Sequence, residues 1–294
     1  MEKKLLLIVN PKAGKTQSRA PLYDAALALS DAGYLIRLRH TSARGEAEAL
    51  AAGAGEYDAV ICCGGDGTLN ETVSGLMRLP SPPPLGYLPR GSTNDFAASL
   101  HLPANPVKAA QLAVGSQPRK LDVGQWNGRQ FVYVASFGAF TRSSYHASQA
   151  AKNALGHFAY ILEGMRDLDT LRPYKLRLTA DGENLDGEYL FGAVCNSTSI
   201  GGLMKLDPEK VVLDDGRFEM LLIPSPRSVA DLNDLIMSLL NQEYDRDGVV
   251  FRHVASVHVE PEGELPWSLD GEYAPSAPVV EIVNQHQALS FLLP

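Results

Sequence analysis

A glycine-rich segment of eight residues, Gly64-Gly65-Asp66-Gly67-Thr68-Leu69-Asn70-Glu71, lies between a predicted strand and a predicted helix. The apolar run 59–63 before it is typical of a buried strand, and residues 69–77 carry apolar side chains at helical spacing. Thr68 and Glu71 have the spacing of a capping box, so we expect the helix to begin at Thr68. Glycine lets a ligand approach the backbone closely, and the free N–H groups of a helix N-terminus attract phosphate. The segment therefore predicts a site for nucleotide phosphates, with Asp66 placed to hold a magnesium ion or its waters.

The first part of the chain alternates predicted strands and helices. We expect strands at 5–9, 34–40, 59–63 and 85–88, and helices at 18–32, at 46–52, from Thr68 and from a cap near Ser92. This alternation is typical of an α/β fold with a parallel, doubly wound sheet. Ligands of such sheets bind beyond the carboxyl ends of the strands, and the turns 10–15, 64–68 and 89–95 all follow predicted strands. We therefore expect these three turns to meet at one edge of the sheet.

After about residue 121 the pattern changes to short β-rich runs separated by turn residues. We expect strands at 131–136, 174–179, 189–195, 218–223, 249–251, 254–259, 279–283 and 289–292, with helices near 149–168 and 228–241. These features predict a C-terminal β-sandwich domain. We divide the chain into an α/β domain, residues 1–121, and a β-sandwich domain, residues 122–294.

Composition agrees with an enzyme of two domains. The chain has 294 residues, of which 45% are hydrophobic, and its net charge of −8 argues against nucleic acid as a partner. Basic residues nevertheless outnumber acidic ones in residues 1–44, which indicates either ordinary solvated surface or a lobe that attracts phosphates or an anionic membrane. The three cysteines lack a disulfide or zinc spacing, and we find no signal peptide and no segment long enough to span a membrane. We therefore expect a cytoplasmic protein.

Two acidic turns in the second part each allow two interpretations. Asp214-Asp215-Gly216 and Asp270-Gly271-Glu272 both contain the Asp-Gly pair that is typical of a hairpin turn. The first turn could instead hold a cation through a carboxylate and nearby carbonyl groups, and the second could present a carboxylate as a general base. Asp122, near the start of a predicted strand, is by itself typical of a turn residue. Spacing alone favours the hairpin in both turns.

Several motifs, taken in order, resemble those of the diacylglycerol kinase catalytic family, the bacterial lipid kinases related to sphingosine and ceramide kinases. They are Asn10-Pro11-Lys12-Ala13-Gly14, the segment 64–71, Gly91-Ser92-Thr93-Asn94-Asp95, Asp215-Gly216 and Leu269-Asp270-Gly271-Glu272. The resemblance covers essentially the whole chain. The glycine segment alone is shared with NAD kinases and phosphofructokinases, whereas its combination with the other motifs is much more specific.

The resemblance implies a kinase that transfers the γ-phosphoryl group of ATP to a lipid hydroxyl, most simply that of diacylglycerol, with the active site between the two domains. It implies Glu272 as the general base, and Asp66, Asp95 and Asp122 as a carboxylate and water network around a catalytic Mg²⁺. A structural Mg²⁺ is implied at Asp215 and the backbone carbonyls of Val212 and Arg217. The implied ATP contacts are Asn10, Pro11, Lys12, Ala13, Gly14, Thr41, Gly65, Asp66, Gly67, Thr68, Leu69, Asn70, Glu71 and Ser92. Two positions depart from the family pattern, because Ser92 stands where threonine is usual and Arg217 where an apolar residue is usual.

The implied lipid substrate predicts a protein that associates with the membrane surface peripherally, without a transmembrane segment, and a homodimer is left open. We expect residues 137–140 and the helix 149–168 as candidates for contact with the acyl chains, although such helices are more often core. Two alternative functions remain: an NAD kinase that phosphorylates a ribose hydroxyl, and a nucleotide-binding regulatory module without turnover. The NAD kinase leaves the Asn10–Gly14 turn and the C-terminal acidic motif unexplained.

Overall fold

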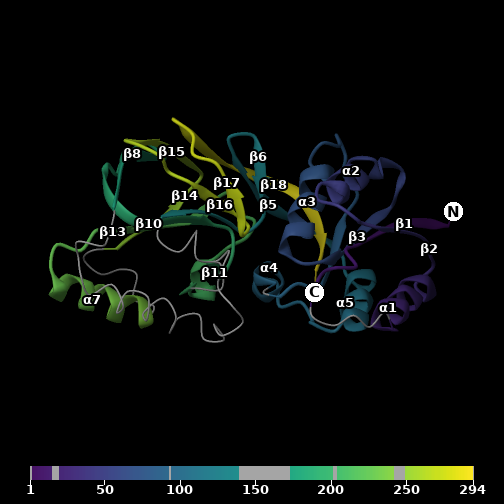
Figure 1. Ribbon diagram of the computed structural model, residues 1–294. Helices are drawn as coiled ribbons and strands as arrows, with labels where there is room; N and C mark the ends of the chain where they lie inside the picture. Colours follow the sequence, from purple (N-terminus) through teal and green to yellow (C-terminus); the bar gives the residue numbers. More distant parts are fainter. Residues whose placement is uncertain are drawn as a thin grey trace. The chain divides into compact units, whose positions relative to one another are not determined.

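The computed structural model describes residues 2–14, 20–92, 94–138, 173–200, 204–241 and 249–293. The chain forms two compact units, of which the first comprises Met1–Val123 and His286–Pro294 and the second Gly124–Gln285 (Figure 1). Strands β5 (Pro118–Trp126) and β18 (Val280–Leu292) contribute residues to both units. The sequence-based division at residue 121 placed the last strand wholly with the second domain, whereas its end belongs to the first compact unit. The assignment of nucleotide and lipid binding to the two domains stays a prediction.

The first unit is a parallel sheet with helices on both faces. Its strands lie in the order β2 (Tyr34–His40), β1 (Lys3–Val9), β3 (Ala59–Gly64) and β4 (Leu85–Pro89), and the end of β18 pairs in parallel with β4. Helices α1 (Ala20–Asp31) and α5 (Pro106–Gly115) cover one face, whereas α2 (Glu46–Ala52) and α3 (Asp66–Leu76) cover the other (Figure 1). The apolar side of β1 packs with α1 and α5 in one core cluster. The predicted doubly wound α/β fold is confirmed.

The second unit is built from antiparallel strands. Its main path runs β17 (Glu272–Ala274), β16 (Trp267–Leu269), β7 (Val134–Gly138), β10 (Gly187–Cys195), β8 (Tyr174–Ala180), β15 (Ser256–Pro261) and β18. Off this path, β13 (Phe218–Pro224) pairs with β10 and with β14 (Val250–Val254), β6 (Arg129–Phe131) pairs with β5, and β9 (Glu183–Asn184) pairs with β8. Two short strands, β11 (Ser199–Ile200) and β12 (Met204–Lys205), form a separate hairpin, and α7 spans Val229–Leu240. Among the described residues of this unit, an aromatic-rich core cluster includes Phe131, Phe137 and Trp267.

Some elements differ from the expectations. The strands expected at 279–283 and 289–292 are one strand, β18, because the polar residues between them continue the extended chain from β15 in one unit to β4 in the other. Helix α5 was not expected, although Asn105 caps it by accepting hydrogen bonds from the N–H groups of Val107 and Lys108. A short helix, α4 (Asp95–Ser99), and two single 3-10 turns, Ala54–Glu56 and Pro208–Lys210, complete the described elements. The helix expected at 149–168 lies outside the described residues.

Candidate active site

Three turns of the first unit pack against one another through glycine. A Cβ atom added at Gly14, whose φ is +78°, would lie 2.2 Å from the carbonyl oxygen of Arg90. A Cβ atom added at Gly65 would lie 3.0 Å from the Cα of Gly91, and the N–H of Arg90 donates to the carbonyl of Gly64 over 2.7 Å. These turns follow β1, β3 and β4. The expectation that they meet at one edge of the sheet is confirmed, and side chains at these glycines would force them apart.

Asn10 and Thr68 join two of these turns. The side-chain amide of Asn10 donates to the hydroxyl of Thr68 over 2.9 Å, and its oxygen accepts the N–H of Lys12 over 3.0 Å. Helix α3 begins at Asp66 with Gly65 as its N-cap, so Thr68 already lies inside the helix. The predicted helix start at Thr68 and its capping box are therefore wrong. The Thr68 hydroxyl holds the Asn10 turn instead of capping its own helix.

Glu71 connects α3 to the start of α2. Its carboxylate accepts hydrogen bonds from the N–H groups of Gly45, over 2.8 Å, and Ala47, over 3.3 Å. Because α3 begins at Asp66, Glu71 lies too far along α3 to cap that helix. Its carboxylate caps the neighbouring helix α2 instead. Thr41, which is 7% exposed, lies at the end of β2 in the segment before that helix, and its N–H donates to the carbonyl of Val9.

The other expected ATP contacts differ in how open they are. Pro11, Lys12, Gly14 and Ser92 are exposed, whereas Asn10, Ala13, Gly65, Asp66, Gly67 and Asn70 are half-buried. Leu69 is fully buried, and its N–H bonds to the carbonyl of Gly65 within α3. Neither the side chain nor the N–H of Leu69 is therefore available for contact with ATP. The set of nucleotide contacts stays a prediction.

The turn after β4 is held by Asn94 and not by Ser92. The Asn94 side chain accepts the N–H of Gly91 over 2.7 Å and donates to the carbonyl of Gly91 over 3.0 Å. Asn94 has a φ of 53° and is the N-cap of α4. The predicted cap near Ser92 is wrong because this small loop closes on itself before the helix begins. Ser92 is left exposed, with its hydroxyl in the turn that packs on Gly65.

Asp66 and Asp95 approach the same tyrosine. Each is the first residue of its helix, α3 or α4, and Asp95 is buried. Burial raises the pKa of the Tyr87 hydroxyl above its usual range, and the negative charges of Asp66 and Asp95 raise this pKa further. The two carboxylates therefore lie close enough to act on one group at the edge where the turns meet.

Asp122 lies inside β5, where it is 1% exposed, so the interpretation as a turn residue is wrong. One carboxylate oxygen accepts the N–H of Gln287 over 2.7 Å and lies 3.1 Å from Nδ1 of His286. Both partners come from β18, which runs alongside β5 in this region. The sequence offered no signal for this contact, because the residues are 164 and 165 positions apart.

The expected metal sites require His, Cys, Asp or Glu side chains that lie close together. Within the described ranges, no three His, Cys, Asp or Glu side chains lie close enough together to hold a metal ion. Asp215 is exposed and accepts the N–H of Arg217 over 2.9 Å. The magnesium assignments, including that of the Val212 and Arg217 carbonyls, stay predictions.

The acidic turn of the second unit is a hairpin, and its interpretation as a general base stays a prediction. Asp270 and Gly271, with φ angles of 50° and 82°, form a two-residue turn between β16 and β17. Glu272 pairs with Leu269 across the turn and is half-buried as the first residue of β17. The hairpin therefore exists, and it also presents a second acidic residue, Glu272, directly beside the turn.

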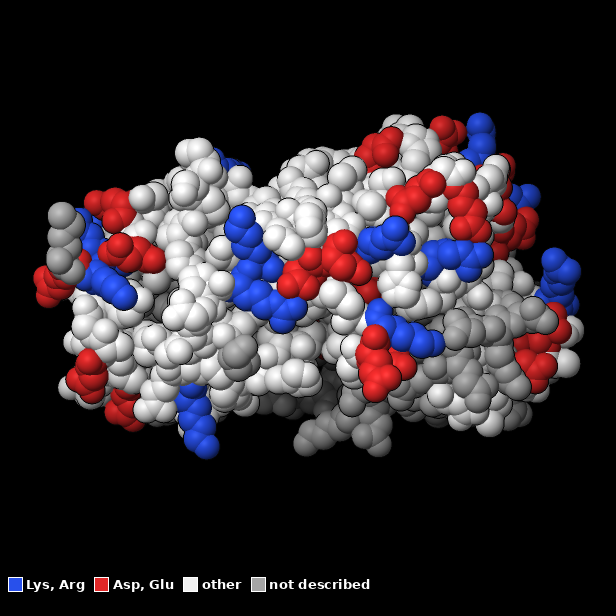
Figure 2. Space-filling model, turned by 180° about the vertical axis from the view of Figure 1, so that it is seen from behind, with Lys and Arg blue, Asp and Glu red and all other residues white. Residues whose placement is uncertain are grey.

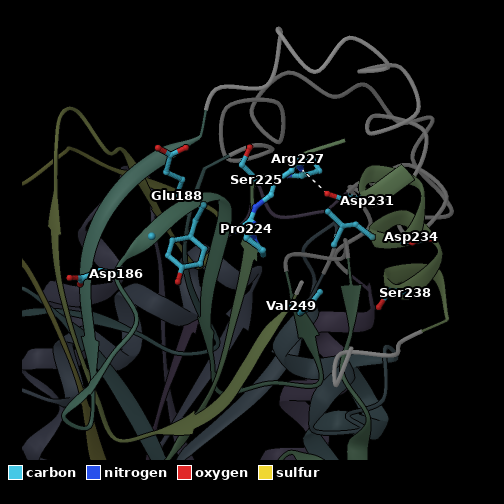
Figure 3. A pocket seen from close by; sticks show the side chains of 13 residues that line it. Asp186, Glu188, Pro224, Ser225, Arg227, Asp231, Asp234, Ser238 and Val249 are labelled. Carbon is cyan, nitrogen blue, oxygen red and sulfur yellow. Dashed lines mark hydrogen bonds between the residues drawn. The ribbon is translucent and has the colours of Figure 1, made fainter. Parts of the chain in front are cut away.

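A cavity of about 1130 Å³ lies elsewhere in the second unit, where β10, β13 and α7 approach one another (Figure 3). Most of the charged side chains in its lining are acidic, and Asp231 accepts the N–H of Arg227 over 3.1 Å. The lining residues are Asp186, Gly187, Glu188, Tyr189, Pro224, Ser225, Pro226, Arg227, Asp231, Asp234, Leu235, Ser238 and Val249. None of the expected site residues is among them, so this cavity is separate from the candidate site.

Figure 2 shows Lys and Arg side chains interspersed with Asp and Glu over the described part of one face. Arg37 and Arg39 are exposed on β2, the outermost strand of the first unit. In the described part of the chain, no helix combines the length and the apolar character that crossing a membrane requires. A membrane-binding role for the basic N-terminal region stays a prediction.

The chain thus combines an α/β unit, whose glycine turns meet at the sheet edge, with a second unit of antiparallel strands. Residues 4–126 match the profile of the diacylglycerol kinase catalytic domain, and residues 134–292 match that of the YegS C-terminal NAD kinase beta sandwich-like domain. Diacylglycerol kinase of Bacillus subtilis (strain 168) is 32% identical over 295 residues, which cover 99% of this chain and 97% of that protein. Diacylglycerol kinase of Staphylococcus aureus (strain bovine RF122 / ET3-1) is 33% identical over 281 residues, covering 95% and 89%.

The crystal structure of a Bacillus anthracis protein described as a diacylglycerol kinase superposes with a TM-score of 0.83. It is 27% identical, and the match covers 100% of this chain and 97% of that one. The chain belongs to the diacylglycerol kinase family.

Proposed function

We propose that this protein transfers the γ-phosphoryl group of ATP to the hydroxyl of a neutral lipid, with diacylglycerol as the acceptor and phosphatidic acid as the product. The observation that carries the proposal is the packing of the turns after β1, β3 and β4 through Gly14, Gly65 and Gly91. A polyphosphate needs backbone N–H groups with no side chains in the way, and we assign this role to the start of α3, which packs with the turns after β1 and β4 at the edge of the sheet where such folds bind ligands. The names of the relatives support the choice of diacylglycerol.

The N–H groups at the start of α3 are the proposed phosphate donors. Gly65 and Gly67 leave the approach to them open, and the helix dipole favours negative charge at this end. Asn10 and Glu71 support the site less directly, because the Asn10 side chain hydrogen-bonds to Thr68 and Lys12 and the Glu71 carboxylate to the start of α2. We therefore propose that these two side chains hold the turns in place while the backbone binds the nucleotide.

Glu272 is the proposed general base, which accepts the proton of the lipid hydroxyl as that oxygen attacks the γ-phosphorus. Phosphoryl transfer leaves little covalent work to the protein, so the rate depends on orientation and on stabilisation of the developing charge. Mg²⁺ bound with ATP would neutralise phosphate charge, and Asp66, Asp95 and Asp122 are the residues that would orient its waters. The proposed reaction takes place at the surface of a membrane that the protein contacts peripherally.

The proposal is tested by incubating the protein with γ-labelled ATP, Mg²⁺ and one acceptor at a time: diacylglycerol, monoacylglycerol, ceramide, sphingosine or NAD. We expect labelled phosphatidic acid from diacylglycerol, and we expect E272Q to lose this product while it still binds ATP. Label in NAD alone would identify an NAD kinase. ATP binding without product from any acceptor would identify a nucleotide-binding module without turnover.

A further inference from the structure

Three two-residue turns of the second unit share one construction. Asn127-Gly128 joins β5 to β6, Asp181-Gly182 joins β8 to β9, and Asp270-Gly271 joins β16 to β17. Both residues of each turn have positive φ angles, as in a type I′ hairpin turn. In each turn the side chain of the first residue also bonds to the backbone of a neighbouring segment. The three turns therefore allow a comparison within one molecule.

Three backbone N–H groups donate to the Asp270 carboxylate. It accepts the N–H groups of Val132, Tyr133 and Val134 over 2.7, 2.9 and 3.0 Å, and the N–H of Asp270 donates to the carbonyl of Val134 over 2.9 Å. Asp270 is 3% exposed. Only a group that accepts hydrogen bonds with both oxygens fits three converging donors, because the amide of an asparagine would point its own N–H atoms at one of them. Removing such an acceptor would leave buried N–H groups without a partner.

The Asp270 carboxylate fixes the direction in which the chain enters β17. The segment 132–134 leads into β7, and β7 pairs with β16 through Leu269 and Ala135. The turn is therefore held on two sides, by the strand ladder and by the carboxylate. The residue that leaves the turn is Glu272.

We propose that Asp270 is the positioning residue for Glu272, and that it does not take part in proton transfer itself. The inference rests on the proposed function, because it assigns Glu272 the role of the base. Placement of a reacting group within about 1 Å is worth roughly 10²-fold in rate, so a carboxylate that locks the turn has a catalytic effect without contact with the substrate. The three donors already occupy the Asp270 oxygens that a base would need.

Asp181 provides a matched control. Its carboxylate accepts the N–H groups of Ala255 and Ser256, over 2.9 and 2.8 Å, and the hydroxyl of Ser256 over 3.0 Å. It occupies the same position of the same kind of turn, but the strand that follows, β9, carries none of the expected site residues. D181N therefore breaks an equivalent contact away from the candidate base.

The experiment compares D270N, D181N and E272Q in the full chain with ATP and diacylglycerol. We expect D270N to lower kcat by about 10²-fold with little change in the KM for ATP, and D181N to leave kcat unchanged. The split between kcat and KM separates a positioning role from a general loss of structure, because misplacement of the base lowers kcat while the nucleotide still binds. The amides of Val132, Tyr133 and Val134 should exchange hydrogen faster in D270N than in the native protein.

Equal kcat values for D270N and D181N would overturn the positioning role, and so would a rise in the KM for ATP as large as the loss of kcat in D270N. Full activity of E272Q would refute the proposed base, and this result does not depend on either aspartate variant. Should D270N fail to fold, the pair G271A and G182A makes the same comparison. Both glycines have φ angles above +80°, and no atom lies closer than 3.9 Å to an added Cβ at either, so each substitution strains only its turn. A loss of kcat confined to G271A would support the proposal, and equal effects would overturn it.

Discussion

Gly14 is the position at which one methyl group should most directly disturb nucleotide binding. In G14A the new Cβ would lie 2.2 Å from the carbonyl oxygen of Arg90, whereas ordinary contacts begin at 3.4 Å. The turn after β1 or the turn after β4 must therefore retreat by more than 1 Å, an estimate that follows from these two distances. The Arg90 carbonyl belongs to the backbone, so no side-chain rotation relieves the contact. The N–H groups of the displaced turn can then no longer converge with those of α3.

The size of the effect follows from the hydrogen bonds at stake. A hydrogen bond to a charged group is worth about 1.5–3 kcal/mol, so loss of one phosphate contact should raise the Kd for ATP by roughly 10- to 150-fold. Alanine also pays about 1–2 kcal/mol for a left-handed backbone. Gly33 supplies the control for that second cost, because its φ is +87° and nothing lies within 4 Å of an added Cβ.

Titration calorimetry with Mg·ATP and thermal unfolding measure the two costs separately. We expect G33A to lower Tm while the Kd for ATP is kept, and G14A to raise the Kd in addition to lowering Tm. An unchanged Kd for G14A would show that the packing of these turns does not shape the nucleotide site. That result would remove the support that the packing of these turns gives to the proposed function.

Three further perturbations test other contacts. E272Q should lower kcat by about 10²–10⁴-fold while ATP binding is retained, and steady-state kinetics beside a binding titration check this; a near-native rate would remove Glu272 as the base. E71Q replaces a carboxylate that accepts two backbone N–H groups at the start of α2, so denaturant unfolding should show a loss of about 1–3 kcal/mol, and an unchanged midpoint would contradict the capping role. Hydrogen bonds to Glu281, and then to Glu260, raise the pKa of His258 above 6.5. This contribution to stability is fully present below pH 6.5 and is lost as pH rises through the raised pKa. H258Q should therefore flatten that part of the Tm–pH curve. An unaltered curve would show that these contacts do not stabilise the folded protein.

Most regular elements of the first unit were predictable because their signals are local, whereas helix α5 was missed. The strand at 34–40 and the helix at 46–52 have the expected bounds, and the glycine segment lies where strand and helix meet. The helix caps were not predictable. A Thr-x-x-Glu pattern fits a capping box by spacing alone, yet Glu71 bonds to α2, which lies beside α3 only in the folded chain. Asn94, and not Ser92, is likewise the N-cap of α4, because the Asn94 side chain hydrogen-bonds to the backbone of Gly91.

The Asp-Gly pair shows why the candidate site could be predicted only in part. The sequence contains this pair at Asp66, Asp181, Asp186, Asp215, Asp247 and Asp270, and pattern alone assigns a turn to each. In the structure Asp66 begins a helix and Asp215 bonds to the N–H two residues further on. Asp181 and Asp270 reach the backbone of other segments, 74 and 136 or more residues away.

Asp181 and Asp270 differ in the strand that follows each turn, which is β9 after Asp181 and β17 after Asp270. The donors around Asp270 belong to the segment that enters β7, and that strand also pairs with β16. One carboxylate therefore sets the angle between a strand ladder and the residue that leaves the turn, Glu272. The Asp-Gly pattern does not indicate which segment of the chain will supply the backbone N–H groups that bond to the aspartate. For that reason the sequence could propose the base, whereas the residue that we infer positions it required the folded chain.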